Sequence, residues 1–124
     1  MTPFLNADGL RLVQQLFART RASNRILIVR RAGDATRIVL DDAAQLTALG
    51  VEAFDYTVAS DDGFETFLAK VALADDQLAY VGSANMTVFA RHSMDLGLLV
   101  EARPARVVAN VLRAVVKVST PLRL

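Results

Sequence analysis

Apolar residues recur with two different periods along this chain, and the changes of period mark its predicted elements. From residue 10 to about 21 they recur every three to four positions, which predicts a helix capped by Asn6 or Asp8. Residues 26–29 form a short continuous apolar run, typical of a strand buried on both faces of a sheet. Residues 1–6 have the pattern of the tail of a strand rather than of the start of a domain.

The rest of the chain continues to alternate between helices and strands. Residues 41–49 predict a helix that ends at Gly50, and residues 51–58 predict the next strand. This order requires crossover connections and therefore a parallel portion of sheet. A further strand is predicted at 94–101, and the clearest helix spans 103–119.

The predicted last helix has two contrasting faces. Its broad apolar face consists of Val107, Val108, Val111, Leu112, Val115 and Val116. The opposite side carries Arg106, Asn110, Arg113 and Lys117. A basic stripe of this kind is more often the solvated face of a packed helix than a nucleic-acid contact. The same interpretation is favoured for Arg30 and Arg31, with a contact to a polyanion as the alternative.

These elements predict one α/β domain over residues 1–124, a mixed β-sheet flanked by helices. The 124 residues allow one compact core, and a 53% apolar content with a mean hydropathy of +0.34 indicates a well-buried globular unit. No apolar run approaches the ~18 residues that span a bilayer, and no signal peptide is visible, so a cytoplasmic location is expected. The net charge of +1 gives no support to a strongly basic nucleic-acid-binding surface. Without cysteine the chain has no disulfide, thiolate nucleophile or cysteine-ligated metal.

Residues 67–85 predict two strands joined by a tight turn at Asp75 and Asp76, followed by a loop of small residues. Alternation places Leu68 and Lys70 on the same face of the first strand. A lysine in the middle of a strand either extends its charged end to water or meets an anion. On residue type alone, the first interpretation is favoured.

The loop after the second strand changes that balance. Gly82 allows a close backbone approach, Ser83 supplies a hydroxyl, and Asn85 supplies an amide. If the two strands pair as a hairpin, Lys70 lies beside this loop. One cation and several neutral donors at one place suit a phosphate.

The spacing of these residues resembles the signature of the phospholipase D superfamily, whose members cleave or transfer phosphodiesters. The family motif is His-x-Lys-x4-Asp-x6-Gly-Ser-x-Asn. Its defined positions after the first are occupied here by Lys70, Asp75, Gly82, Ser83 and Asn85. The first position departs from the motif, because Leu68 stands where the family has histidine. The resemblance implies an α/β/α sandwich, and it extends more loosely to bacterial phospholipase D-like proteins associated with anti-phage defence.

The resemblance also implies a catalytic mechanism. In the superfamily two copies of the motif meet at one site, either as halves of one chain or across a homodimer. One histidine attacks phosphorus and the other protonates the leaving group, with no metal or cofactor. By this resemblance, Lys70 and Asn85 bind non-bridging phosphate oxygens, and Ser83 assists them.

Three other positions receive roles from the same resemblance. Asp75 and Gly82 are structural members of the motif. An acidic residue on the following strand often orients the family's histidine, and Asp95 is the best candidate, ahead of Glu101. A strand-end carboxylate with a local partner is an equally good account of Asp95.

The leucine at position 68 decides whether this copy of the motif can catalyse. Leucine can neither attack phosphorus nor carry a proton. Three accounts of this leucine stay open. The chain is a natural degenerate copy, an otherwise competent enzyme with a substituted active site, or one half of a two-motif protein. The beginning at Met1 favours a truncated or half-length copy. His92, the only histidine, is the least favoured substitute because it has no spacing match.

Two functional classes stay open. The first is a phospholipase D-like phosphodiesterase or nuclease-type domain that is inactive unless a histidine at position 68 or a partner restores the chemistry. Its expected partners are a phosphodiester, with nucleic acid favoured over phospholipid, and a second copy or motif-bearing half. The second class is a non-catalytic module that binds phosphate or nucleic acid, or that serves assembly. A structural domain in which Lys70 only reaches water ranks third.

Overall fold

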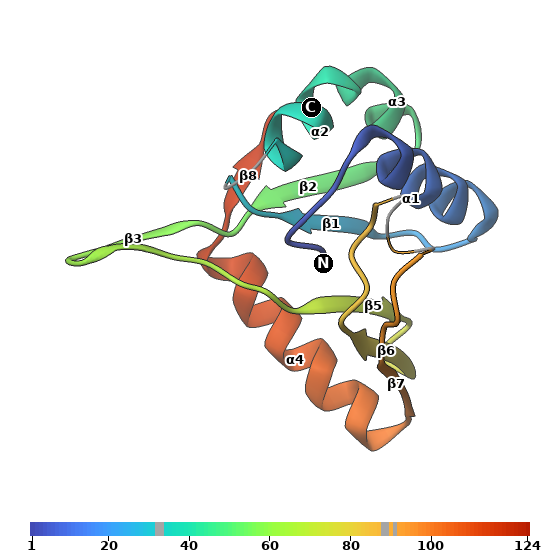
Figure 1. Cartoon of the computed structure of the whole chain (residues 1–124). Coiled ribbons are helices and arrows are strands. Elements are labelled where there is room, and N and C mark those ends of the chain that lie inside the picture. Colours follow the sequence, from blue (N-terminus) through green and yellow to red (C-terminus); the bar gives the residue numbers. More distant parts are fainter. Residues whose placement is uncertain (32–33, 88–89, 91) are drawn as a thin grey trace.

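The structure of the chain is a computed structural model that describes residues 1–31, 34–87, 90 and 92–124. The described helices are α1 (Ala7–Arg19), α2 (Ala35–Asp41), α3 (Ala43–Ala48) and α4 (Arg103–Val118). The described strands are β1 (Arg25–Val29), β2 (Val51–Asp55), β3 (Val58–Ser60), β4 (Gly63–Glu65), β5 (Lys70–Ala74), β6 (Leu78–Gly82), β7 (Gly97–Glu101) and β8 (Thr120–Leu122). Figure 1 shows α1, α2 and α3 together on one side and α4 on the other, with strands between them. The chain is therefore a mixed α/β structure, as predicted.

A parallel pair of strands carries the main core. β1 and β2 run in parallel register from Arg25 opposite Val51 to Val29 opposite Asp55, and β8 pairs antiparallel with β2. The parallel pair confirms the predicted crossover, because α2 and α3 connect β1 to β2. The core side chains come from these strands, from α1 to α3 and from the N-terminal segment, and they are Leu5, Leu10, Val13, Leu27, Val29, Ala35, Val39, Leu46, Val51 and Ala53.

The start of α1 is held by a side-chain cap and by a close packing contact. The Asn6 Oδ1 atom accepts a hydrogen bond from the Gly9 backbone nitrogen at 2.8 Å, which confirms the predicted cap. A Cβ atom at Gly9 would overlap the carbonyl group of Met86. The first turn of α1 therefore packs directly on the backbone that follows the motif loop.

β5, β6 and β7 form an antiparallel sheet that contains the predicted hairpin. Asp75 and Asp76 have φ angles of 50° and 57°. The ladder ends with Ala74 opposite Leu78, and the Gln77 nitrogen donates to the Ala74 carbonyl oxygen at 3.0 Å, so residues 75–77 connect the strands. Two consecutive left-handed residues are typical of a tight hairpin turn, and aspartate tolerates this conformation better than most residues. Arg113 of α4 donates to Asp76, so the turn is tied to the helix. α4 itself approaches the sheet through two small buried residues, Ala105 and Ala109.

The N-terminal segment joins the two three-stranded sheets. Met1 exchanges two backbone hydrogen bonds with Val71 of β5, at 2.8 and 3.0 Å, which is the pattern of an antiparallel pair. The Thr2 nitrogen donates to the carbonyl oxygen of Ile28 in β1 at 3.0 Å. Residues 1–6 therefore have the strand-like character that the sequence predicts. As a result, the carboxyl end of β1 and the start of β5 lie at the same edge of the combined sheet.

Some predicted boundaries differ from the structure. The helix predicted at 41–49 is α3, which begins only at Ala43, and a separate helix that was not predicted, α2, ends at Asp41. Asp42 lies between them, and its side chain accepts a hydrogen bond from Gln14 of α1 at 2.7 Å. Residues 59–63, for which the sequence predicts no strand, belong to the β3–β4 hairpin, which extends away from the rest of the chain (Figure 1). Its side chains are almost all exposed, so no apolar pattern marks these strands. The strand predicted at 94–101 begins only at Gly97.

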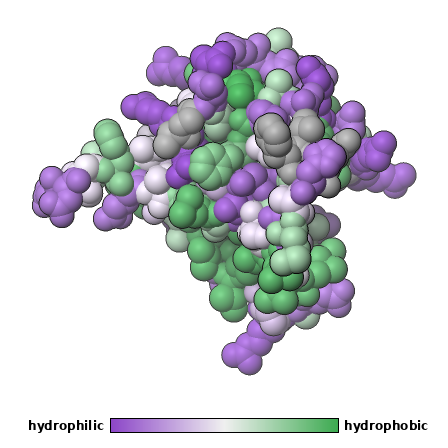
Figure 2. Space-filling model, viewed as in Figure 1, coloured by the Kyte–Doolittle hydropathy of each residue, from purple (hydrophilic) through white to green (hydrophobic). Residues whose placement is uncertain are grey.

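A large part of the apolar surface stays uncovered around β7 and α4. The predicted apolar face of α4 is only partly packed, since Val107 and Val111 are 57% and 58% exposed. Leu98 and Leu99 of β7 are also exposed. Figure 2 shows apolar side chains gathered in the lower part of the view, over α4 and the β5–β7 sheet. Across the described ranges, none of the helices has the length and apolar character that crossing a membrane requires.

Candidate functional site

The register of the β5–β7 sheet brings the predicted site residues toward one edge. Lys70 lies opposite Gly82, and Gly82 lies opposite Gly97 of β7. Because β6 ends at Gly82, the loop to Asn85 begins directly beside Lys70. The sequence predicts this arrangement from the hairpin alone, and the strand register confirms that the hairpin forms.

Tyr80 occupies the space above the two paired glycines. A Cβ atom at Gly82 or at Gly97 would overlap the ring or hydroxyl of Tyr80. Residues two apart on a strand share a face, so Tyr80 and Gly82 lie on the same face as Lys70. Sequence reasoning missed Tyr80, although the spacing of Tyr80, Gly82 and the cross-strand Gly97 is the signal of a ring lying across a glycine pair.

Lys70 is half-buried at the start of β5. No hydrogen bond or ion pair joins its ammonium group to any residue that the structure describes. Its charge nevertheless acts on Asp95, because it is one of the causes that lower the pKa of that carboxyl group. The lysine is therefore a cation near the motif loop without a carboxylate in direct contact among the described residues.

Ser83 and Asp95 are hydrogen-bonded to each other. The Ser83 Oγ atom donates to Asp95 Oδ1 at 2.9 Å and accepts from the Leu96 backbone nitrogen at 3.0 Å. Ser93 donates to the other carboxylate oxygen of Asp95 at 2.7 Å. The single hydroxyl proton of Ser83 is thus used within the chain. Donation from Ser83 to a phosphate requires this bond to Asp95 to break.

These two serines set the charge state of Asp95. The hydrogen bond from Ser93 is the largest cause that lowers the pKa of Asp95 below its ordinary value of 3.8, followed by that from Ser83, while burial acts in the opposite direction. The local partners agree with the alternative account of Asp95 as a strand-end carboxylate.

Replacing Ser83 with alanine should raise the pKa of Asp95 toward 3.8, since one stabilising donor to the carboxylate is lost. A lowered folded-state pKa stabilises the fold above the ordinary pKa, and this contribution is lost as the pH falls through the folded-state pKa. The Ser83→Ala variant should therefore show a smaller loss of stability on acidification. Carboxyl NMR titration measures the shift, and Ser93→Ala is the matched comparison, with a larger expected shift. An Asp95 pKa that is unchanged in both variants would contradict the assignment.

Asn85 lies against a cavity of about 270 Å³ between the motif loop and α1. The described residues that line this cavity are Asp8, Gly9, Leu12, Ala84, Asn85, Met86, Thr87 and Ala90. The Asn85 Oδ1 atom is buried and has no hydrogen-bond partner among the residues that the structure describes. An unsatisfied buried polar atom costs about 1–3 kcal/mol, which a ligand or a water molecule can recover. The structure places Asn85 on the α1 side of the loop and Ser83 on the β7 side.

Two further predicted positions stand outside the strands. Leu68 lies two residues before β5 and is 63% exposed, whereas the neighbouring Phe67 is buried. His92 is exposed in the segment that leads to β7. Among the described residues, no three histidine, cysteine or carboxylate side chains gather into a group that could hold a metal ion.

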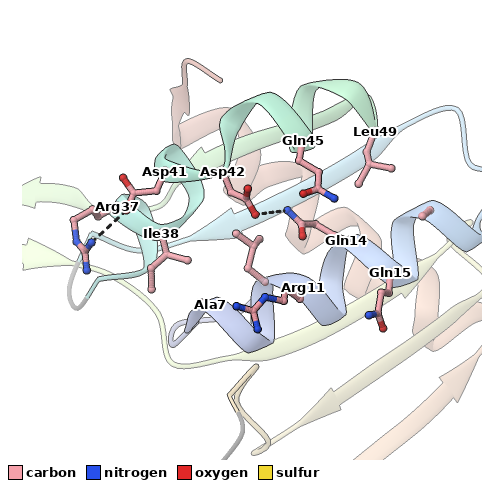
Figure 3. A pocket seen from close by; sticks show the side chains of 12 residues that line it. Ala7, Arg11, Gln14, Gln15, Arg37, Ile38, Asp41, Asp42, Gln45 and Leu49 are labelled. Carbon is pink, nitrogen blue, oxygen red and sulfur yellow. Dashed lines mark hydrogen bonds and ion pairs between the residues drawn. The ribbon is translucent and has the colours of Figure 1, made fainter.

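A second cavity, of about 840 Å³, lies elsewhere, between α1 and the α2–α3 pair. Figure 3 shows its polar walls, where Gln14 contacts Asp42 and Arg37 contacts Asp41. These side chains satisfy one another. None of the residues predicted from the motif lines this cavity, so size alone does not identify the candidate site.

The comparisons with known proteins agree with the architecture. No protein-family model matches this sequence, and no curated protein matches it. A solved structure, the phospholipase D family member Nuc from Salmonella typhimurium, matches 91% of this chain and 74% of its own with a TM-score of 0.66. The two sequences are 15% identical, so the likeness shows the fold alone. The chain has a phospholipase D-like fold, as its motif predicts.

Proposed function

We propose that this chain binds a phosphodiester group at Lys70 and the loop that ends at Asn85, and that it does not hydrolyse the phosphodiester by itself. The observation that carries the proposal is the pairing of Lys70 with Gly82, which sets beside the motif loop a lysine that contacts no carboxylate of the described residues. A positive charge next to neutral donors suits an oxyanion. The missing chemistry follows from Leu68, which has no nucleophilic atom.

The residues of the proposed site contribute to phosphate binding in different ways. Lys70 supplies charge. Asn85 supplies its amide group, which must turn its NH₂ toward a phosphate oxygen, because the unpaired Oδ1 is an acceptor like the phosphate itself. Ser83 contributes only after it releases Asp95, so its share of the binding energy is the smallest of the three. Asp75 and Gly82 shape the hairpin and its end.

A second copy of the chain, or a second motif-bearing half, is the proposed protein partner. The exposed leucines near the motif support this pairing, since Leu68, Leu96 and Leu98 are 63%, 77% and 71% exposed. Two copies meeting through the face of Leu68 and Lys70 form a composite site. A partner with a histidine at the equivalent position supplies a nucleophile to that site, whereas two copies of this chain make an inert one. A cytoplasmic location and a part in anti-phage defence remain predictions.

Replacing Lys70 with alanine should weaken the binding of dimethyl phosphate and of a short single-stranded oligonucleotide by about ten- to a hundredfold. A hydrogen bond to a charged group contributes about 1.5–3 kcal/mol, and 1.4 kcal/mol is tenfold in affinity. Isothermal titration calorimetry measures the first ligand and fluorescence anisotropy the second.

Lys117 provides the matched control, because it is the other lysine of the chain and lies exposed on α4. Equal losses in Lys70→Ala and Lys117→Ala indicate general charge attraction and contradict the site. Absence of anion binding in the unaltered chain, together with a stable dimer in analytical ultracentrifugation, supports the alternative of an assembly module.

A further inference from the structure

The N-terminal segment contacts the end of the motif loop, and Arg30 links this segment to the residues just before Leu68. Leu5 forms a parallel β-bridge with Met86, the residue after Asn85. On its other side the segment is bonded to Arg30, whose Nε atom donates to the Pro3 carbonyl oxygen at 3.1 Å. Phe4 therefore lies in a segment that reaches the motif loop.

Arg30 also contacts the segment at the start of the motif, just before Leu68. Its Nη1 atom donates to the Phe67 carbonyl oxygen at 3.5 Å, one residue before Leu68. Its guanidinium carbon lies 4.2 Å from the centre of the Phe4 ring. Carbonyl oxygens and an aromatic face hold this cation in place, and no ion pair joins it to a carboxylate of the described residues. A guanidinium has five N–H donors, so several remain for a ligand.

The neighbouring arginine is in a different situation. Arg31 is exposed and lies 3.6 Å from the carboxylate of the buried Asp55, which also accepts from Thr57 and from the Arg31 backbone. From the sequence, Arg30 and Arg31 have the same interpretation as solvated charges at the end of a strand. The structure leaves Arg30 half-buried and without a carboxylate among its described contacts, and it lies at the sheet edge where Lys70 begins β5.

We propose that Arg30 and Phe4 form a second subsite, which holds the adjacent phosphate and a base of a single-stranded nucleic acid. This inference rests on the proposed binding of a phosphodiester at Lys70. Phe4 is 40% exposed although Arg30 covers part of it, so the ring offers an aromatic surface beside a positive charge. Proteins that bind single strands combine these two features, because the charge attracts the backbone and the ring stacks on a base. A phospholipid headgroup has no base to stack.

Two substitutions separate the parts of this subsite. Arg30→Gln should weaken binding of a short single-stranded oligodeoxynucleotide by about tenfold and lower the slope of log K against log salt concentration by about 1. It should leave the affinity for dimethyl phosphate unchanged, since that ligand has a single phosphodiester. Phe4→Leu should weaken oligonucleotide binding by about tenfold with no change in the salt slope. Arg30→Lys keeps the charge, and should therefore keep the salt slope.

Arg21→Gln is the charge-matched control, because Arg21 is exposed and precedes β1 while Arg30 follows it. Thermal melting of each variant shows whether it folds, and if Arg30→Gln does not, Phe4→Leu and Arg30→Lys decide the question. Equal effects of Arg30→Gln and Arg21→Gln overturn the subsite, as does an unchanged oligonucleotide affinity in Phe4→Leu. An equal loss of dimethyl phosphate binding in Arg30→Gln also overturns it, since Arg30 then acts only by positioning the segment around Phe67 that leads into β5.

Further outcomes distinguish a failure of the second subsite from a failure of the phosphodiester site at Lys70, and nucleic acid from lipid as the ligand. If Lys70→Ala leaves the affinity for both dimethyl phosphate and the oligonucleotide unchanged, the proposed phosphodiester site itself is wrong. If Lys70→Ala weakens both ligands while the Arg30 and Phe4 variants bind normally, only the second subsite fails. Tighter binding to vesicles of phosphatidylglycerol than to the oligonucleotide, with the same dependence on Arg30, overturns the nucleic-acid assignment.

Discussion

Replacing Leu68 with histidine is expected to give this chain a phosphodiesterase activity that persists in EDTA, at least about a hundredfold above that of the unaltered chain. Leu68 is 63% exposed, so an imidazole fits without repacking the core. It lies two residues before Lys70, the proposed phosphate ligand. An imidazole nitrogen can form a bond to phosphorus while the bond to the leaving oxygen breaks, and a second histidine can protonate that oxygen. Because each copy brings one histidine, the gain should rise with the fraction of dimer.

Hydrolysis of bis(p-nitrophenyl) phosphate and of single-stranded DNA in EDTA measures this gain. Leu68→Gln is the matched control, since glutamine is polar and similar in size but is not a catalytic nucleophile. The double variant Leu68→His with Lys70→Ala should lose the activity again. A folded, dimeric Leu68→His variant that stays inactive shows that the pocket serves binding alone. A monomeric inactive variant points instead to a missing motif-bearing half.

Replacing Gly9 with alanine is expected to destabilise the fold by about 1–2 kcal/mol and to weaken anion binding. Two effects oppose each other at this position. Alanine favours a helix over glycine by about 1 kcal/mol, but the new Cβ would overlap the carbonyl group of Met86. Overpacking costs about 1–3 kcal/mol, and the atoms in the way are backbone atoms, which cannot turn aside as a side chain does. Because Met86 follows Asn85, movement of this backbone also displaces the proposed amide ligand.

Urea denaturation measures the free energy of unfolding of Gly9→Ala, and calorimetry measures its affinity for dimethyl phosphate. Ala18→Gly is the matched control in the same helix, because Ala18 is exposed. That control should lose about 0.5–1 kcal/mol through helix propensity and should bind anions normally. A Gly9→Ala variant that is more stable than the unaltered chain would show that helix propensity prevails and that the Met86 contact is loose.

Several features could be predicted from the residues because they depend on near neighbours. The turn at Asp75 and Asp76 follows from two residues that tolerate a left-handed backbone between alternating strands. The cap at Asn6 follows from a bond that spans three residues. The motif spacing then predicted that Lys70 lies beside the Gly82 loop, since a tight hairpin allows one register. The likeness of the whole fold to a phospholipase D family member agrees with that motif.

Other features depend on contacts between distant residues, and the sequence carries no local signal for them. The bond of Ser83 to Asp95 joins residues 12 apart, and it engages the hydroxyl that the resemblance assigns to phosphate binding. The break between α2 and α3 occurs where Asp42 meets Gln14, 28 residues away. The β3–β4 hairpin was missed because exposed strands have no buried face to impose an apolar period.

The sequence by itself determined the motif, its missing histidine and the hairpin that presents Lys70, because these depend on residue identity, short spacing and local backbone preference. Only the tertiary structure decided which charges are compensated. Arg30 and Arg31 are adjacent, yet one is paired with Asp55 and the other contacts Phe67, 37 residues away, and the ring of Phe4. A charged side chain pairs with a carboxylate, or remains available to a ligand, according to which distant segments pack beside it. The periodicity of residues along the chain does not indicate that packing.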